Sequence, residues 1–497
     1  MNRLLTVLIL LAGSAGPRWA EVSVLAGHGP AGRPMLGTAG ADSLLFEDSP
    51  FGFHPARVPP DVSGGDPWAP ARDMGVHWHR PVVYAFWFRC QPTDGDRAKG
   101  LFRWDRLDRS VQDVPPHINV LWNLSARFAT RPGSFLPRDV EGYKKYVAAV
   151  VERYDGDGID DAPGSPVVRY WQVENEPNLG FPPRSPESYA ELLQMTYRAA
   201  KRASPRCRIV IGGVGGWVGR GPNSSLHGFR RFYLPVLKRL DGAGFDIFDY
   251  HWYGNASGEY RGYGEVHRQV RAALDEHGFS HAPIWITEMG SFSGHPRHNP
   301  PQSEQQQAAD LLRRYVYPLS WGVQKIFWAF GLIEGFKHDD GYFDHTGLIY
   351  DGRGSDDRGR GVRKLAYFTY KLMTDKLEGK RFAGELAGLP PHVYAYRFID
   401  GQESRDANAV TVLWWDWWNE PGTAEKAVAL PAQGTLHVTS AITAGDGTRR
   451  SWVLRAHKGR MRITLGKAPL LVERPIHPVP THPQGNQAPE PLEGDRP

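Results

Sequence analysis

The chain has 497 residues, of which 41% are hydrophobic and 23% are charged, a composition typical of a globular protein larger than one compact domain. The net charge is only +5, and both signs are spread along the chain without a basic stripe or basic helix, which argues against nucleic-acid binding. Beyond the first twenty residues, no segment is apolar over the length that a membrane helix needs, so we expect no stable membrane insertion.

The first twenty residues have the pattern of a secretion signal. An arginine precedes the apolar run Leu4–Ala12, which is too short to span a bilayer, and small residues follow it. We therefore predict that Met1–Ala20 is a signal peptide and that the mature protein is secreted or periplasmic. Residues 21–43 are rich in glycine, alanine and proline and are predicted to form an extended lead-in segment.

Residues 44–379 alternate short β-rich runs with helical stretches, which indicates a parallel sheet covered by helices. Eight such runs are present, the number that a closed (β/α)8 TIM barrel of the α/β class requires. The predicted strands are Phe51–His54, Val76–Arg80, Ile118–Leu124, Val167–Glu176, Arg208–Gly212, Phe245–Tyr253, Pro283–Glu288 and Lys325–Phe330. The clearest helices are Leu136–Tyr154, Ser185–Ala203, Gln302–Trp321 and Lys364–Leu377.

The pattern changes after Gly379 to short alternating strands, which predicts a small antiparallel β-sandwich over residues 380–474. Its predicted strands are His392–Phe398, Ala409–Trp415, Thr435–Ser440, Met461–Leu465 and Leu470–Glu473. Residues 475–497 are polar and rich in proline, and we predict a disordered tail.

Two cysteines, Cys90 and Cys207, are far apart in the chain. Cys90 follows the end of one predicted strand and Cys207 precedes the start of another, so we place them at opposite faces of the barrel. An oxidising compartment would permit a disulfide, but this placement favours two unpaired thiols. The spacing matches no metal-binding cysteine motif.

The segment Trp171–Pro177 (WQVENEP) ends a buried strand in polar groups. Pro177 cannot continue the ladder and disfavours a helical conformation for Glu176, so we expect extended backbone there. Barrel enzymes place their chemistry at this C-terminal end of the strands. The alternative is a strand-end glutamate that caps the following helix.

The segment Ala282–Gly290 (APIWITEMG) repeats the pattern, because an apolar strand again ends in a glutamate, Glu288. The alternative is a solvated strand end. Glu176 and Glu288 close predicted strands four and seven, which can face each other across a barrel mouth. Glycosidic bond cleavage uses two carboxyl groups, roughly 5–5.5 Å apart in retaining enzymes and roughly 6.5–9.5 Å apart in inverting ones.

These motifs resemble clan A of the glycoside hydrolases, and most of all family 39 and related enzymes that combine a barrel with a sandwich. The similarity extends over the barrel rather than one motif. The matching residues are Asn175, Glu176 and Pro177 at strand four, Glu288 at strand seven, Arg80 at strand two, His251 and Tyr253 at strand six, and Trp328 at strand eight. The 17 tryptophans and 20 tyrosines suit such a protein, because aromatic faces stack on sugar rings, although a core also uses them.

The resemblance implies a retaining glycosidase. Glu176 would be the acid/base, and Glu288 the nucleophile that Arg80 keeps ionised. Asn175 would bind the 2-hydroxyl of the sugar, and Tyr253 would donate to Glu288. His251 lies on the same strand face as Tyr253 and is either a site residue or a core histidine.

The resemblance also implies that Trp328 is a stacking platform beneath the cleaved sugar, with a cis peptide bond between Trp328 and Ala329. Softer candidates are His54 and Asn123, which could line the same subsite, with Trp122 beside Asn123 and Trp217 at a neighbouring subsite. His54 could equally be structural. A solvated loop is the better interpretation of Asp339, Asp340 and His345.

Three other functions remain open. A transglycosidase would use the same residues, and a non-catalytic sugar-binding barrel would lack one of the two glutamates. A metallohydrolase could use Glu288, His251 and His54, but the sequence has no compact ligand motif such as His-Glu-x-x-His. We expect an oligo- or polysaccharide as the partner and no metal or other cofactor; the sequence predicts no oligomeric state.

Overall fold

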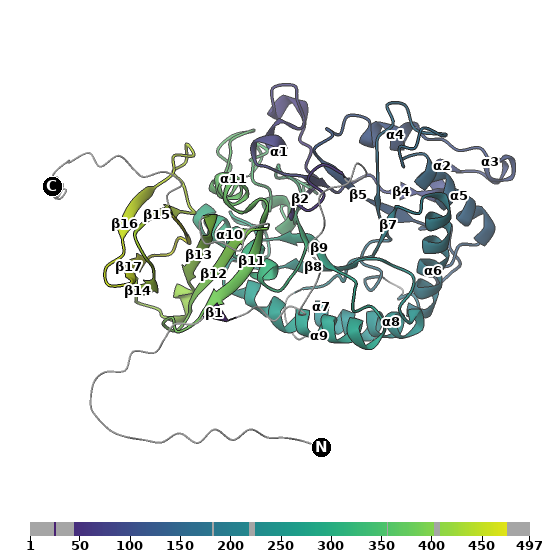
Figure 1. Cartoon of the computed structure of the whole chain (residues 1–497). Helices are drawn as coiled ribbons and strands as arrows, with labels where there is room; N and C mark the ends of the chain where they lie inside the picture. Colours follow the sequence, from purple (N-terminus) through teal and green to yellow (C-terminus); the bar gives the residue numbers. More distant parts are fainter. Residues whose placement is uncertain are drawn as a thin grey trace, which may run out of the picture.

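The computed structural model describes residues 24–25, 44–180, 183–217, 224–354, 356–401 and 408–474. The predicted signal peptide Met1–Ala20, the predicted tail 475–497 and the lead-in segment 21–43 apart from Val24–Leu25 lie outside these described residues. A barrel wrapped by helices occupies one side of the molecule, and a smaller antiparallel β unit packs beside it (Figure 1). Within the described ranges, no helix has the length and apolarity needed to cross a membrane.

Eight parallel strands of the described chain form the barrel, in the order β7-β6-β5-β3-β2-β10-β9-β8. Bridges from Val210 to Ile247 and from Val214 to Tyr250 join β7 to β8 and close the cylinder. Each strand overlaps one predicted from the sequence, and the predicted (β/α)8 barrel is confirmed. The strands are β2 (Phe51–His54), β3 (Trp78–His79), β5 (Asn119–Ser125), β6 (Tyr170–Val173), β7 (Arg208–Ile211), β8 (Phe248–Tyr253), β9 (Ile284–Gly290) and β10 (Lys325–Ala329), with the short β4 (Ala85–Phe86) paired to β5.

The barrel interior is built in layers. The lower layer is an apolar plug of Trp78, Leu121, Tyr170, Val210, Ile247, Trp285 and Phe327. Because side chains alternate along a strand, the residue two positions further on faces the interior one layer higher. On five strands that residue is polar and fully buried, namely Arg80, Asn123, Gln172, Asp249 and Thr287. A polar layer therefore rests on the apolar plug, towards the C-terminal ends of the strands.

A β-bulge in β9 changes which way its last residues face. Asp249 of β8 pairs with Trp285, but His251 pairs with Glu288, so β9 holds one extra residue between these two positions. The pairing of β9 with β10 shifts at the same place. Ile286 and Met289 pack outward in the large core, whereas Glu288 contacts side chains inside the barrel. The bulge therefore lets Glu288 join Thr287 on the inner face.

Helices cover the outside of the barrel, and four of them were predicted from the sequence. The longest, α6, begins after Ser185, whose side chain accepts a hydrogen bond from the Ser188 amide as an N-cap. The α-helices are α1 (Ala69–Asp73), α2 (Trp87–Cys90), α3 (Asp94–Lys99), α4 (Asp105–Val111), α5 (Val140–Glu152), α6 (Pro186–Ala203), α7 (Ser225–Gly228), α8 (Leu234–Leu240), α9 (Tyr263–Glu276), α10 (Glu304–Ser320) and α11 (Leu365–Leu377). Short 3-10 or π turns are η1 (Pro60–Val62), η2 (Phe229–Tyr233), η3 (Glu259–Gly262), η4 (Tyr342–His345) and η6 (Trp417–Asn419). Cys90 and Cys207 are both buried and unpaired, as predicted.

The smaller unit is an antiparallel sandwich, as predicted, but three of its strands were missed and one comes from the lead-in segment. Its larger sheet has the order β1-β11-β12-β13-β18-β15-β16, and β14 pairs with β17 opposite it around a shared aliphatic core. The missed strands are β11, β14 and β16. The strands are β1 (Val24–Leu25), β11 (Lys380–Leu386), β12 (Val393–Asp400), β13 (Val410–Trp415), β14 (Lys426–Pro431), β15 (Thr435–Ser440), β16 (Ser451–Arg455), β17 (Arg460–Leu465) and β18 (Leu470–Glu473). β1 covers the edge of β11, which would otherwise be open.

Buried polar contacts hold the sandwich to the barrel. The Tyr260 hydroxyl, from η3 of the barrel, donates to the Asp416 carboxylate at 2.8 Å and accepts from the Trp414 indole at 2.8 Å. Arg313 of α10 brings its Nε to 3.9 Å from the same carboxylate. Asp416 is fully buried, so its charge depends on these barrel groups.

Candidate active site

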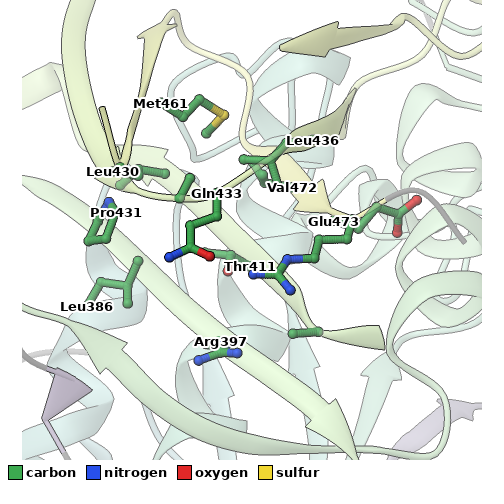
Figure 2. A pocket seen from close by; sticks show the side chains of 14 residues that line it. Leu386, Arg397, Thr411, Leu430, Pro431, Gln433, Leu436, Met461, Val472 and Glu473 are labelled. Carbon is green, nitrogen blue, oxygen red and sulfur yellow. The ribbon is translucent and has the colours of Figure 1, made fainter. Parts of the chain in front are cut away.

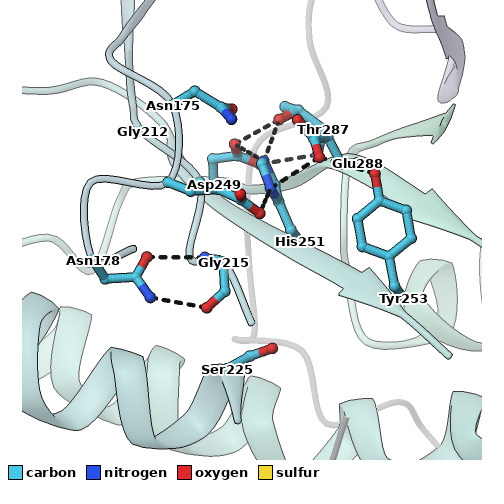
Figure 3. A network of polar contacts seen from close by, with 12 residues as sticks. Asn175, Asn178, Gly212, Gly215, Ser225, Asp249, His251, Tyr253, Thr287 and Glu288 are labelled. Atoms are coloured by element: carbon cyan, nitrogen blue, oxygen red, sulfur yellow. Dashed lines mark hydrogen bonds and ion pairs between the residues drawn. The ribbon is translucent and has the colours of Figure 1, made fainter. Parts of the chain in front are cut away.

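Glu176 and Glu288 meet at the C-terminal end of the barrel, beside His251. One carboxylate oxygen of each glutamate and one His251 nitrogen all lie within 4.8 Å of one another. The two glutamates come from the ends of β6 and β9, which are not neighbours in the barrel. Figure 3 shows Glu288, His251 and Tyr253 converging from β8 and β9. An approach this close is compatible with a retaining glycosidase, whose carboxyl groups lie roughly 5–5.5 Å apart, better than with an inverting one, whose carboxyl groups lie roughly 6.5–9.5 Å apart.

Glu288 is a buried, ionised carboxylate. Its Oε1 accepts from Arg80 Nη1 at 2.6 Å and its Oε2 from the Tyr253 hydroxyl at 2.9 Å. Burial alone would raise the pKa of Glu288, but the positive charges of His251 and Arg80 lower it to about 2. The side chain has both its charge and its orientation fixed before any substrate arrives.

Arg80 is positioned by groups that the sequence left unassigned or assigned differently. Its Nε donates to Gln172 Oε1 at 2.9 Å and its Nη2 to Asn175 Oδ1 at 2.6 Å. Asn123 donates to the same Gln172 oxygen at 3.0 Å and is fully buried. Asn123 therefore supports Gln172 and, through it, Arg80, instead of lining the cleft. Tyr84 also borders the site, because the Arg80 guanidinium carbon lies over its ring, 5.9 Å from the ring centroid. No strand pattern in the sequence indicates this position.

His251 links the two glutamates to a buried aspartate. Its Nδ1 lies 2.8 Å from Glu176 Oε1 and 3.4 Å from Glu288 Oε2. Its Nε2 lies 3.3 Å from Asp249 Oδ2, and Asp249 accepts from both the amide and the hydroxyl of Thr287 (Figure 3). Burial lowers the pKa of His251, but Glu288 and Asp249 outweigh it and raise the pKa to about 10. The imidazole is therefore a cation at neutral pH.

Asp249 was missed at the sequence level although a signal was present. Asp249, His251 and Tyr253 are spaced by two residues on β8, so all three face the barrel interior. An aspartate two positions before a site histidine on the same strand face is in position to hold its second nitrogen. Gln172 and Thr287 gave a weaker signal, because both lie inside the two glutamate motifs.

The backbone at Glu176 is not extended, which corrects the sequence prediction. β6 ends at Val173, and φ is positive at Glu174 (63°) and Glu176 (42°). The tight turn that follows, closed by the Leu179 amide donating to the Glu176 carbonyl at 2.8 Å, competes with the local preference set by Pro177. Glu174 anchors this turn, since its carboxylate accepts from the Ser125 hydroxyl at 2.8 Å and the Ala126 amide at 2.9 Å. The Glu176 side chain stays 24% exposed, whereas Glu174 is buried.

Two glycines after β7 allow the loop to approach the polar network. A Cβ on Gly213 would lie 2.1 Å from His251 Nε2 and 2.6 Å from Asp249 Oδ2. A Cβ on Gly215 would lie 2.6 Å from the Glu176 carboxyl carbon. Asn178 fixes the loop by bonding both the amide and the carbonyl of Gly215, at 3.0 and 2.9 Å (Figure 3).

Trp328 does not face the site, which corrects its predicted role. Phe327 belongs to the apolar plug inside the barrel, so alternation turns Trp328 outward, where it is fully buried and its indole donates to the Thr346 carbonyl at 2.9 Å. Phe330 takes the place near the nucleophile, stacked at 6.2 Å on Tyr253 and at 4.1 Å on Phe336. The cis peptide bond joins Ala329 and Phe330, one residue later than predicted.

His54 lies in the site. Its Nδ1 donates to the Arg80 carbonyl at 2.7 Å, which leaves Nε2 directed at Glu288 Oε1, 3.9 Å away. Burial and the Arg80 charge lower the pKa of His54 to about 3, so it is neutral there. Trp122 is buried against Trp171 and away from the cleft.

The loop after β10 is organised by Asp344, whose carboxylate accepts from the amides of residues 337–340. Asp340 in this loop lies 3.0 Å from His345, and both line a polar hollow with Asp344. Asp339 accepts from the Gly341 amide at 3.0 Å. No contact places Asp339, Asp340 or His345 against the two glutamates among the described residues.

A separate cavity of about 400 Å³ lies in the sandwich unit (Figure 2). Its wall combines aliphatic side chains with the polar Arg397 and Gln433; the aliphatic ones include Leu386, Leu430, Leu436, Met461 and Val472. Among the described residues that line it, Glu473 is the one carboxylate, and it pairs with Lys376 at 2.5 Å. The paired acids that hydrolysis needs are therefore found at the barrel mouth and not here.

No protein-family profile and no curated protein matches the chain. Solved structures resemble it at low sequence identity. A family 39 glycoside hydrolase from Bacteroides cellulosilyticus is 19% identical with a TM-score of 0.57, over 81% of this chain and 76% of its own. A glucosidase from Croceicoccus marinus is 17% identical with a TM-score of 0.56, over 86% and 97%. A family 51 α-L-arabinofuranosidase from Thermotoga petrophila is 12% identical with a TM-score of 0.56, over 83% and 90%. The chain thus has the fold of clan A glycoside hydrolases, as its motifs implied.

Proposed function

We propose that the protein is a retaining glycoside hydrolase that cleaves O-glycosidic bonds by double displacement, with Glu288 as nucleophile and Glu176 as acid/base. The observation that carries the proposal is the approach of the two carboxylates, whose nearest oxygens lie within 4.8 Å, at the mouth of the barrel. Their environments differ as the two roles require. Glu288 is buried and held ionised by cations, whereas Glu176 is partly exposed on a turn.

In the first step, Glu288 attacks the anomeric carbon and Glu176 gives a proton to the leaving oxygen. Arg80 and Tyr253 hold Glu288 by its two oxygens, so the attack needs little reorganisation. His251 Nδ1 occupies Glu176 Oε1, which leaves Oε2 to carry the proton. Asn175 donates to the 2-hydroxyl, a contact that strengthens in the transition state.

In the second step, Glu176 removes a proton from water, which attacks the glycosyl ester on Glu288. When this step begins, Glu288 is an uncharged ester and Glu176 carries the negative charge; when it ends, Glu288 is ionised again and Glu176 is protonated. The His251 cation lies within 3.4 Å of an oxygen of each glutamate, so it compensates whichever of the two is charged. The site changes from one step to the next without changing its net charge.

The stereochemical course and the identity of the nucleophile have separate tests. Xylosides, glucosides and arabinosides with a 4-nitrophenyl leaving group form the first screen, because the solved structures of similar fold include a xylosidase, a glucosidase and an arabinofuranosidase. Proton NMR should show a first product with the anomeric configuration of the substrate; inversion would overturn the double displacement.

Glu288→Gln should abolish turnover. Glu378→Gln, which changes a glutamate at the end of α11, should not. Ordinary turnover by Glu288→Gln would show that Glu288 is not the nucleophile.

A transglycosidase would pass through the same intermediate and is distinguished by its product when an alcohol competes with water. A non-catalytic binding barrel would bind sugar without turnover in the screen. The metal-dependent alternative is disfavoured by charge, since a cation would enter between protonated His251 and Arg80, which already contacts Glu288 at 2.6 Å.

We also propose that the substrate is an oligo- or polysaccharide outside the cytoplasm and that the protein is secreted or periplasmic. The signal-like pattern of Met1–Ala20 supports export. Expression with and without residues 1–20, followed by mass measurement of the protein recovered outside the cytoplasm, tests it. A full-length mass, or retention of the leader-bearing form inside the cell, would contradict the proposal.

A further inference from the structure

Trp217 presents an aromatic face to solvent on the loop after β7. It is 48% exposed, which is unusual for so large an apolar side chain unless a bound molecule covers it. Its ring stacks on Phe343 at 6.2 Å with an interplanar angle of 22°, and it meets Tyr342 edge-on at 5.6 Å. Its backbone is fixed too, because its carbonyl accepts from the Ser225 amide at 3.1 Å.

A chain of ring contacts connects Trp217 to the nucleophile. Phe343, on which Trp217 stacks, lies 5.1 Å from Tyr253, and the Tyr253 hydroxyl donates to Glu288. Phe343 also lies 5.0 Å from Phe330, which stacks on Tyr253. We call Trp217, Phe343, Phe330 and Tyr253 the aromatic wall. Its outer end is exposed at Trp217, and its inner end contacts Glu288 through Tyr253.

The outer end of the aromatic wall lies on the Glu176 side of the site. Gly215, two residues before Trp217, packs so closely that a Cβ there would lie 2.6 Å from both the Glu176 carboxyl carbon and Leu179 Cδ1. Leu179 is itself 47% exposed. A general acid lies beside the oxygen that leaves, so apolar groups next to Glu176 face the leaving part of the substrate.

We propose that Trp217, with Leu179, binds the sugar ring on the leaving-group side of the cleaved bond. The inference rests on the proposed function and extends it: the substrate has at least two sugar units, and the second unit stacks on the Trp217 indole through the C–H groups of one ring face. Binding energy collected there lowers the barrier only for substrates whose leaving group reaches Trp217.

Two substrates that share one glycosyl group test this binding surface. A glycosyl fluoride releases an ion that cannot touch Trp217, whereas the matching disaccharide releases a sugar that can; the sugar tested is the one turned over fastest in the aryl glycoside screen. In Trp217→Ala, kcat/KM for the disaccharide should fall about ten-fold relative to kcat/KM for the fluoride. Trp217→Phe, which keeps a flat aromatic face, should recover most of the loss.

Phe46→Ala is the matched control. Phe46 is 49% exposed and stacks on His77 before β3, at the opposite end of the barrel, so its loss should leave the ratio of the two rates unchanged. An unchanged ratio in Trp217→Ala, or an equal fall in Phe46→Ala, would overturn the leaving-group surface while fluoride hydrolysis still supported the proposed function. Failure to hydrolyse both substrates would overturn both.

Discussion

His251 is the residue on which the charge balance of the site depends. It is fully buried, yet it is a cation, because carboxylates approach both of its nitrogens. Asp249 belongs to neither of the two proposed catalytic steps and contacts His251, Thr287 and Gln172 instead of the reacting groups. It is therefore a positioning residue, and its contribution can be separated from that of Glu176 and Glu288.

Replacing Asp249 with asparagine should lower the pKa of His251 below its present value of about 10, because one of the carboxylates that raise it is lost. NMR titration of the imidazole measures this directly. The alkaline limb of kcat/KM should move to lower pH in the same variant. An unchanged His251 titration would mean that Asp249 has only a structural part in the network.

Glu176→Ala should separate substrates by their leaving groups. Without a proton donor, substrates with poor leaving groups should slow by roughly 10²–10⁴-fold, whereas aryl glycosides with a good leaving group should lose far less in bond cleavage. Single-turnover kinetics with both substrate types measures the split. Equal losses on both would count against an acid role.

Glu174→Gln is the natural control for that experiment, because Glu174 belongs to the same motif but is buried against Ser125 and Ala126. Its substitution should affect both substrate types alike.

At the level of elements, the loop after β7 must come close to β8, and glycine makes that possible. A methyl group on Gly213 would collide with His251 and Asp249. Gly213→Ala should therefore displace His251, destabilise the fold by about 1–3 kcal/mol and lower kcat more than that loss of stability explains. Urea unfolding and kinetics on the same preparation measure both effects. Gly445→Ala, at a position with open space around it, should change neither; a fully active Gly213→Ala would contradict the assigned contact.

The elements differ in how far the sequence predicts them. The eight barrel strands and both glutamate motifs follow from local patterns, because β-rich runs and strand-end carboxylates are visible residue by residue. The bulge at Glu288 depends on pairing with β8 and β10, which no local pattern records. The Trp328 error has the same origin, since the face that a strand residue presents depends on which neighbour enters the barrel. The positive φ of Glu176 comes from a turn closed by Leu179, against the preference that Pro177 sets.

At the level of the whole molecule, the barrel and the sandwich share a buried polar junction. Tyr260→Phe removes the hydroxyl that donates to Asp416 and accepts from Trp414, and it leaves a buried carboxylate with less compensation. The expected cost is about 1–3 kcal/mol in the free energy of unfolding, measured by urea denaturation. Tyr84 lies at the barrel mouth, away from this junction. Tyr84→Phe should therefore shift the unfolding midpoint less than Tyr260→Phe does. An unchanged midpoint in Tyr260→Phe would show that the junction contributes nothing to stability.

The free energy of unfolding should depend on pH through the same two charged groups of the site, His251 and Glu288. Burial lowers the pKa of His251, but Glu288 and Asp249 raise it from 6.5 to about 10. Folding therefore favours the protonated form, and this stabilisation is complete below pH 6.5 and is lost as the pH rises through 10. Burial raises the pKa of Glu288, but His251 and Arg80 lower it from 4.5 to about 2, so its stabilisation is present above pH 4.5 and is lost as the pH falls through 2.

A comparison with His251→Asn isolates the first of these terms. The difference in unfolding free energy between the wild type and this variant, from urea denaturation, should shrink as the pH rises from 6.5 to 10, because over that range unfolding of the wild type, but not of the variant, releases the proton held by residue 251. His457→Asn, at an exposed histidine of the sandwich, should follow the wild type at every pH. A difference that stays constant or grows between pH 6.5 and 10 would mean that His251 is neutral in the folded protein, and the charge compensation between Glu176 and Glu288 would then need another source.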